Sequence, residues 1–343
     1  MRPPGIHLLS VGTALPGPPV DNATLTRAFN LPPIWTDWID TFVGTRTRHF
    51  SVDLETGKLR YTLADLGETA SRQALVSAGL HPGDVDLMVM GTSSPDRLMP
   101  TTVNVIADLL GIDGVPTYQL QSGCSGAVQA MDLACRLLLS GRHRHALVIG
   151  ADSCAKHTDL TMDAASLPPA EQVNGALFGD GAGAMMLAAQ ARPGAPAIQH
   201  VFHRLEGLNR EPGQIVEWFG RGDRDSCRQP LAEDYKAIEE SVPKMSVEIL
   251  DELLEELDWL KSDIDYLLPP QLSGRMTRQI VRRLAVPRAH EVSCVRDTGN
   301  VGNALPFFQL GLALPRMAEG DRAVAIAVES SKWIKAGFAL EMG

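Results

Sequence analysis

One cysteine in this sequence is placed for nucleophilic chemistry. Cys124 lies in a Ser-Gly-Cys-Ser-Gly turn, residues 122–126, and apolar residues with helical spacing follow the turn to about Ser140. Unpaired N–H groups and the helix dipole at such a position favour a thiolate, and the glycines let a ligand approach the backbone. The pattern therefore predicts a cysteine nucleophile at the start of a buried helix. The alternative is a cysteine that only packs as a small apolar side chain.

The second half of the chain repeats the features around this turn. Residues 297–302 form a second glycine turn, again before an apolar helix, and Asn300 takes the place that Cys124 has in the first half. The buried strands predicted at 84–90 and 263–268 correspond in the same way. We predict that Cys124 and Asn300 face each other near a pseudo-twofold axis.

Alternation of strands and helices in two equivalent halves predicts a duplicated α/β fold with the two glycine-turn helices at its centre. We place the first half at residues 1–190, with the nucleophilic cysteine, and the second at 191–343, with Asn300. The spacing agrees, since Cys124 precedes Asp152 by 28 positions and Asn300 precedes Glu329 by 29.

Composition narrows the class of protein. The 343 residues are 44% hydrophobic and 21% charged, with a net charge of −10, so nucleic acid is not an expected partner. Five scattered cysteines form no C-x-x-C pair, which is typical of a reduced protein without a structural zinc site. We expect a cytoplasmic protein, because neither a signal peptide nor a membrane-spanning run is present.

The chain resembles the ketoacyl-ACP synthase III group of the thiolase-fold ketosynthases over essentially its whole length. The resemblance is carried by residues 122–127, by the Leu-Phe-Gly-Asp-Gly-Ala-Gly-Ala segment at 177–184, by 298–300 and by Trp38. It implies a five-layer αβαβα fold, a homodimer and a Cys–His–Asn triad that takes acyl groups from thioesters. It also implies a donor on acyl carrier protein, with no metal and no cofactor beyond the donor's phosphopantetheine arm.

The sequence departs from that family at the triad. Pro270 stands at the position of the catalytic histidine, and proline cannot relay a proton. The family's glycine-rich C-terminal loop is replaced by residues 329–333, where the backbone N–H of Ser330 can still serve as an oxyanion donor. Phe42 and Gln172 stand where two arginines flank the CoA nucleotide, which weakens the case for CoA as donor.

Three functions are compatible with these departures. We expect ping-pong acyl transfer through Cys124 to a hydroxyl or amine of a small natural-product intermediate, with Asn300 orienting the acyl group or the acceptor. Divergent members of the family in antibiotic pathways show such behaviour. The alternatives are a decarboxylative carbon–carbon condensing enzyme and a non-catalytic partner subunit. No base is identified, and His157 and His290 are candidates by residue type alone.

The resemblance also gives candidate binding residues. Arg275, Arg278 and Arg282 share one face of a predicted basic helix and are candidates for docking acyl carrier protein, although an ordinary solvated face is the simpler interpretation. Met99 replaces an aromatic residue, which leaves room for a bulkier acyl group. The residues matched to substrate-binding positions of the family are Trp38, Ser93, Met99, Pro270 and Ser273.

Overall fold

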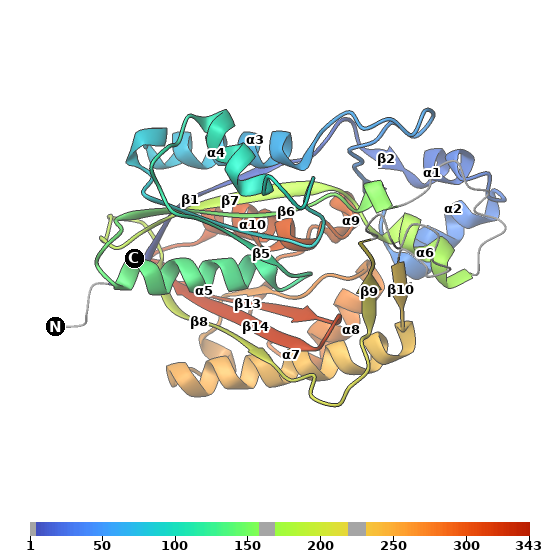
Figure 1. Cartoon of the computed structure of the whole chain (residues 1–343). Coiled ribbons are helices and arrows are strands. Elements are labelled where there is room, and N and C mark those ends of the chain that lie inside the picture. Colours follow the sequence, from blue (N-terminus) through green and yellow to red (C-terminus); the bar gives the residue numbers. More distant parts are fainter. Residues whose placement is uncertain (1–4, 158–168, 219–230) are drawn as a thin grey trace.

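The two halves of the chain each build a five-stranded sheet with the same strand order (Figure 1), and one pair between β1 and β8, at His7 and Ala197, joins the two into a continuous ten-stranded sheet. The computed structural model describes residues 5–157, 169–218 and 231–343. If the strands of each sheet are numbered along the chain, both sheets read third, second, fourth, fifth, first. The first sheet contains β1 (His7–Ala14), β4 (Leu87–Thr92), β5 (Thr117–Gln121), β6 (His145–Asp152) and β7 (Gly181–Ala188). The second contains β8 (Ala197–Leu205), β11 (Tyr266–Leu268), β12 (His290–Glu291), β13 (Arg322–Glu329) and β14 (Ile334–Glu341).

Helices form the other three layers. Figure 1 shows α3 (Leu63–Ala78) and α4 (Thr102–Leu110) outside the first sheet, and α7 (Tyr235–Leu257) and α8 (Gly274–Leu284) outside the second. Between the sheets lie α5 (Gly126–Leu139) and α10 (Leu305–Ala313), which share one apolar core with both of them. The predicted αβαβα five-layer fold with two pseudo-equivalent halves is therefore confirmed. The exact boundary between the halves, near residue 190, remains a prediction.

The strands and helices follow from local sequence. Every residue of β4 and β7 is buried, in agreement with the apolar runs that predict strands covered on both faces. Helix α3 begins with a capping box between Thr62 and Asp65 and ends at Gly79, whose φ of 65° is the left-handed conformation that glycine adopts readily.

Two glycines let the central helices approach the first sheet closely. A Cβ atom on Gly91 of β4 would lie 2.3 Å from the carbonyl oxygen of Gly126, at the start of α5. A Cβ atom on Gly183 of β7 would lie 2.3 Å from the Cβ of Phe307 in α10. These contacts require glycine, and they fix the depth at which both glycine turns sit between the sheets.

Two local predictions were wrong. The polar and aromatic residues at 35–40 predict a surface loop, but this segment forms α2 (Ile34–Trp38) and a π-helical turn (Ile39–Val43), and the indole rings of Trp35 and Trp38 pack with centroids 4.6 Å apart. The apolar run after the second glycine turn predicts a helix that ends near Gly320, but α-helical geometry ends at Ala313, because Pro315 has no N–H to continue it. No helix in the described ranges combines the length and apolar character needed to cross a membrane.

Candidate active site

Cys124 and Asn300 line the same chamber. Cys124 lies between the end of β5 and the N-cap residue of α5, Ser125. The backbone of Asn300 is held on both sides, because its N–H donates to the carbonyl of Leu177 (2.9 Å) and its carbonyl accepts from the N–H of Gly179 (3.0 Å). The second glycine turn is thus fixed by the Leu-Phe-Gly-Asp-Gly segment of the first half.

An aspartate at the end of β6 supports the turn that contains Asn300. The Asp152 carboxylate accepts hydrogen bonds from the backbone N–H and the side-chain Nδ2 of Asn303, both at 2.8 Å. Its other oxygen accepts from the Thr92 hydroxyl (3.3 Å), from the Ser93 N–H and hydroxyl (both 2.8 Å), and from the Ser94 hydroxyl (2.9 Å). Six donors therefore converge on one buried carboxylate.

A glutamate at the end of β13, the corresponding strand of the second half, supports the Cys124 turn. Oε2 of Glu329 accepts from the Ser125 N–H (3.4 Å), and Oε1 accepts from the Ser331 N–H (3.1 Å). The side chain is 1% exposed and lies against Gly123, where a Cβ atom would be 2.3 Å from Oε2. Each half thus supplies a carboxyl group that holds the glycine turn of the other half.

The thiol of Cys124 is not activated by its helix in the way that the sequence predicts. Burial raises the pKa of Cys124 well above its usual range, and the carboxyl groups of Glu329 and Asp152 raise it further. The N–H groups expected to stabilise a thiolate are already used, because Ser125 donates to Glu329 and Ala127 donates to Oδ1 of Asn303 (2.8 Å). The direction of this shift is opposite to the lowered pKa that the sequence predicts.

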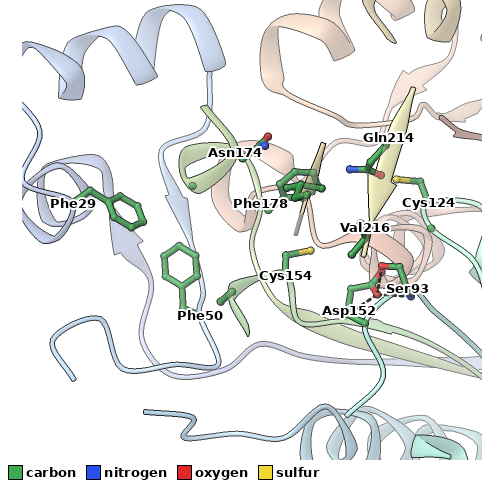
Figure 2. A pocket seen from close by; sticks show the side chains of 16 residues that line it. Phe29, Phe50, Ser93, Cys124, Asp152, Cys154, Asn174, Phe178, Gln214 and Val216 are labelled. Carbon is green, nitrogen blue, oxygen red and sulfur yellow. Dashed lines mark hydrogen bonds between the residues drawn. The ribbon is translucent and has the colours of Figure 1, made fainter. Parts of the chain in front are cut away.

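Two cavities meet at Cys124. The first, here called the polar pocket, is shown in Figure 2, where Ser93 and Asp152 lie near Cys124 and Phe29 and Phe50 lie at the far end. It contains about 820 Å³ of empty space, its opening included. Asn174 and Gln214 form its polar wall, and both belong to a larger cluster, because Asn174 accepts from the Tyr235 hydroxyl and Gln214 donates to Glu233.

The second cavity, here called the apolar chamber, contains about 570 Å³ of empty space with its opening. Its wall consists of Cys124, Asn300 and mostly aliphatic residues, and Pro270 stands in this wall. Oδ1 of Asn300 accepts from the Gly302 N–H (3.1 Å), which leaves the Nδ2 donor without an acceptor in the part of the chain that the structure describes. No histidine and no charged side chain is among the described residues that line it.

A third cavity opens beside α8 and shares Ile238 and Leu272 with the apolar chamber. This third cavity, here called the entrance, is lined by Trp38, Ser273 and Arg275, so the structure brings these predicted residues together. The Ser273 hydroxyl accepts from the Met276 N–H (3.1 Å) as the N-cap of α8, which explains a serine at this position without reference to a substrate.

Comparison with known proteins identifies the family. Residues 118–204 match the 3-oxoacyl-[acyl-carrier-protein (ACP)] synthase III family, and residues 254–330 match the C-terminal part of that family. The β-ketoacyl-[acyl-carrier-protein] synthase III of Neisseria meningitidis serogroup C is 30% identical over 298 residues, which cover 85% of each chain. The chain belongs to the ketoacyl-ACP synthase III family. Enzymes of this family act on thioesters of acyl carrier protein or CoA without a metal or other cofactor.

Solved structures of the family agree with the fold. AbyA1, described as a tetronic acid condensing enzyme, is 57% identical with a TM-score of 0.95, over 98% of this chain and 99% of that one. The priming β-ketosynthase of the R1128 polyketide pathway is 27% identical with a TM-score of 0.83, over 99% and 98%. The synthase III of Pseudomonas aeruginosa PAO1, at 24% identity, 98% coverage of both chains and a TM-score of 0.83, supports the fold alone.

Several of the other candidate residues do not line these cavities. Met99 is 84% exposed and lines none of the three cavities, because it lies on the loop between β4 and α4. His290 is exposed on β12, at the sheet edge, where its ring packs against Tyr266, so it cannot act on Cys124. The side chain of His157 lies outside the described residues. Arg278 and Arg282 are exposed on α8, as their predicted docking role requires.

Sequence reasoning missed the role of Glu329. In the family, glycines occupy the loop that begins at this residue. From the sequence, their replacement by residues 329–333 indicated only a change in the shape of the loop. The signal was present in the spacing, since Glu329 follows its glycine turn at almost the same distance as Asp152 follows the first one. No group of three or more potential metal ligands occurs in the described parts of the chain.

Proposed function

We propose that this protein is a condensing enzyme that joins two acyl thioesters without decarboxylation, with one of them held on Cys124 as an acyl-enzyme. The observation that carries the proposal is that Cys124 lies where the two cavities meet. An acyl group on its sulfur therefore has a second cavity beside it for a second substrate. The similarity to AbyA1, a tetronic acid condensing enzyme, supports the same class of reaction.

The chemistry of a tetronic acid ring explains how the site can do without a histidine. This ring is a five-membered lactone with one carbon–carbon and one ester bond between its two precursors. An α-hydroxyacyl thioester and a 3-ketoacyl thioester supply all its atoms, with loss of two thiols and no CO₂. C2 of a 3-ketoacyl thioester lies between two carbonyl groups and is already acidic, so no malonyl group has to be decarboxylated to make the carbanion.

The steps follow from the residues at Cys124. The thiol gives up its proton and attacks the carbonyl of the α-hydroxyacyl thioester, and the carrier thiol leaves with a proton. The C2 carbanion of the second thioester then attacks the acyl-enzyme, and the sulfur of Cys124 leaves and is protonated again. Attack of the α-hydroxyl on the remaining thioester closes the lactone and releases the second thiol.

Two donors are proposed to stabilise these intermediates. The Nδ2 group of Asn300 points to no protein acceptor in the described chain and donates to the enolate oxygen of the second substrate. Ser330 lines the apolar chamber, and its backbone N–H is the proposed donor to the oxyanion that forms at the acyl carbon. An acidic carrier protein would dock on the cationic face formed by Arg275, Arg278 and Arg282, beside the entrance that Trp38 lines. As in the resemblance stated above, two copies of the chain form a homodimer.

Acyl transfer alone, to a hydroxyl or amine of a small molecule, is the second candidate. The absence of charged and histidine side chains among the described residues of the apolar chamber favours it, because a preformed amine nucleophile needs less help from a base. A non-catalytic subunit is less consistent with a cysteine that opens to two cavities.

Intact-protein mass spectrometry distinguishes these functions. The protein is mixed with an α-hydroxyacyl thioester and then with a 3-ketoacyl thioester, an amine or a malonyl thioester. We expect an adduct on wild type but not on Cys124→Ser, and its release by the 3-ketoacyl thioester as a lactone. Release only by the amine supports acyl transfer, CO₂ from the malonyl thioester supports decarboxylative condensation, and the absence of any adduct contradicts all covalent mechanisms.

A further inference from the structure

The two cavities at Cys124 differ in chemistry, although they share the wall formed by Cys124 and Gly302. The polar pocket is lined largely by apolar side chains, among them Phe29, Phe50 and Phe178, but it also presents the amides of Asn174 and Gln214, the latter hydrogen-bonded to the carboxyl group of Glu233. Such a wall suits an acyl group that carries a hydroxyl. The apolar chamber presents aliphatic side chains from α7, from the segment after β11, from α10 and from β13, namely Ile238, Val242, Leu272, Leu305, Ile326 and Val328.

The glutamines in the chamber wall do not make it polar. The Nε2 group of Gln271 donates to the carbonyl of Val292 (3.0 Å), and its Oε1 accepts from the N–H groups of Cys294 and Val295 (2.9 and 2.8 Å). The Nε2 group of Gln309 donates to the carbonyls of Pro269 and Val292 (both 2.9 Å). Both side chains are 2% exposed, so they support loops rather than contact a ligand.

The remaining polar groups of the chamber lie near Cys124. Gly302, two positions after Asn300, lines both cavities, and Glu329, the neighbour of Ser330, contacts Gly123 beside the thiol, whereas aliphatic residues form most of the remaining wall. A thioester in this chamber can therefore place its carbonyl groups against Asn300 while its chain extends along apolar surface. A carboxylate there would lose its hydration without gaining a cationic partner among the described lining residues.

We propose that the apolar chamber is the binding site for the acyl chain of the second thioester, and that it selects a long, uncharged alkyl chain. The inference rests on the proposed two-substrate function, which it deepens by assigning each substrate to a cavity. The polar pocket then holds the hydroxylated acyl group on Cys124, and the chamber excludes substrates with a terminal carboxylate. Selection by chain length follows because each buried methylene contributes about 0.8 kcal/mol, or about fourfold in affinity.

Binding of S-alkyl pantetheine thioethers to the wild-type protein tests this assignment without catalysis. These compounds cannot acylate Cys124, and their dissociation constants can be measured by calorimetry for chains of about four to ten carbons. We expect affinity to rise up to about fourfold with each methylene until the chamber is filled. An otherwise identical chain that ends in a carboxylate should bind at least about 100-fold more weakly.

Matched variants locate the chain. Val328→Phe and Leu305→Phe each reduce the space in the apolar chamber, whereas Val216→Phe reduces the space in the polar pocket. The two chamber variants should remove the gain in affinity beyond short chains and leave acylation of Cys124 by an α-hydroxyacyl thioester within about twofold of wild type. Val216→Phe should have the opposite pattern.

Two results would overturn the assignment: affinity that does not depend on chain length in wild type, or loss of that dependence in Val216→Phe alone. Thermal unfolding of the same three variants shows whether each protein is folded. If alkyl chains bind as expected but no 3-ketoacyl thioester is condensed, the proposed function fails while the chamber assignment stands. If condensation occurs without any preference for chain length, only the chamber assignment fails.

Discussion

Asp152 and Glu329 occupy corresponding positions at the ends of β6 and β13, but their environments differ. Asp152 accepts six hydrogen bonds, so its charge is fully compensated by donors. Glu329 accepts two backbone N–H groups, and burial raises the pKa of its carboxyl group. The difference shows that corresponding positions of a duplicated fold can diverge: both carboxyl groups hold a glycine turn, but only Glu329 contacts the turn that contains Cys124.

The largest effect is expected for Asp152→Ala. The substitution leaves buried donors from four residues without an acceptor, and we expect a loss of about 3–5 kcal/mol in the free energy of unfolding. Chemical denaturation measures the loss, and Asp108→Ala, an exposed residue on α4, is the control with an expected change within about 0.5 kcal/mol. Equal stabilities of the two variants would show that the six contacts are not structural.

Substitution of the two glycines that contact these carboxyl groups should destabilise the protein to different extents, and more at the glycine beside Asp152 than at the glycine beside Glu329. A Cβ atom on Gly302 would lie 2.3 Å from Oδ2 of Asp152, which cannot move, and the φ of Gly302 is 54°. A Cβ atom on Gly123 meets Glu329, whose longer side chain can shift. We expect Gly302→Ala to cost about 2–4 kcal/mol in unfolding free energy and Gly123→Ala about 1–2 kcal/mol. If Gly123→Ala lost more stability than Gly302→Ala, Asp152 would not be the more rigid of the two carboxyl groups.

Glu329→Gln should change the pH dependence of acylation. The ionised carboxyl group raises the pKa of Cys124, so its removal lowers that pKa and moves the pH–rate profile of adduct formation toward lower pH. Near neutral pH we expect a faster acylation rate, by up to about tenfold, measured by stopped-flow or quenched mass spectrometry. A large loss of rate at all pH values would instead show that Glu329 accepts the proton of the thiol and acts as the missing base.

The smallest effect concerns stability against pH. Because burial raises the pKa of Glu329 in the folded protein, folding is favoured with this carboxyl group protonated. That contribution is complete below the ordinary value of 4.5 and is lost as the pH rises through the higher folded-state pKa. Relative to wild type, Glu329→Gln should therefore gain stability, by about 1 kcal/mol, between pH 4.5 and neutrality. If the difference in stability between Glu329→Gln and wild type stayed constant across this pH range, the pKa of Glu329 would not be raised.

The sequence predicts most of the fold, because its signals are local and repeated. Capped amphipathic helices such as α3, apolar strands such as β4 and the two glycine turns all carry their pattern in a few adjacent residues. The predicted and observed helix boundaries differ most at Pro315, which ends a helix early, and at Trp35, whose ring packs against Trp38 within a helix that the sequence does not predict.

The site was less predictable because its chemistry depends on contacts between distant segments. The pKa of Cys124 depends on Glu329, 205 positions later in the sequence, and the N–H groups near the cysteine are used by residues of the other half. Met99, a position matched by resemblance, lies on an exposed loop of the single chain, and its role in substrate binding remains a prediction. Contacts between residues of different halves cannot be predicted from the sequence of either half alone.

The reciprocal contacts between the halves also bear on how the protein is made. Residues 1–190 contain the cysteine and its helix, but Asn303 and Glu329, which hold the Cys124 turn, are synthesised last. A partly synthesised chain therefore carries Cys124 without the contacts that shape its surroundings. Only after the segment from Asn303 to Glu329 has docked is the Cys124 turn held by both of these residues.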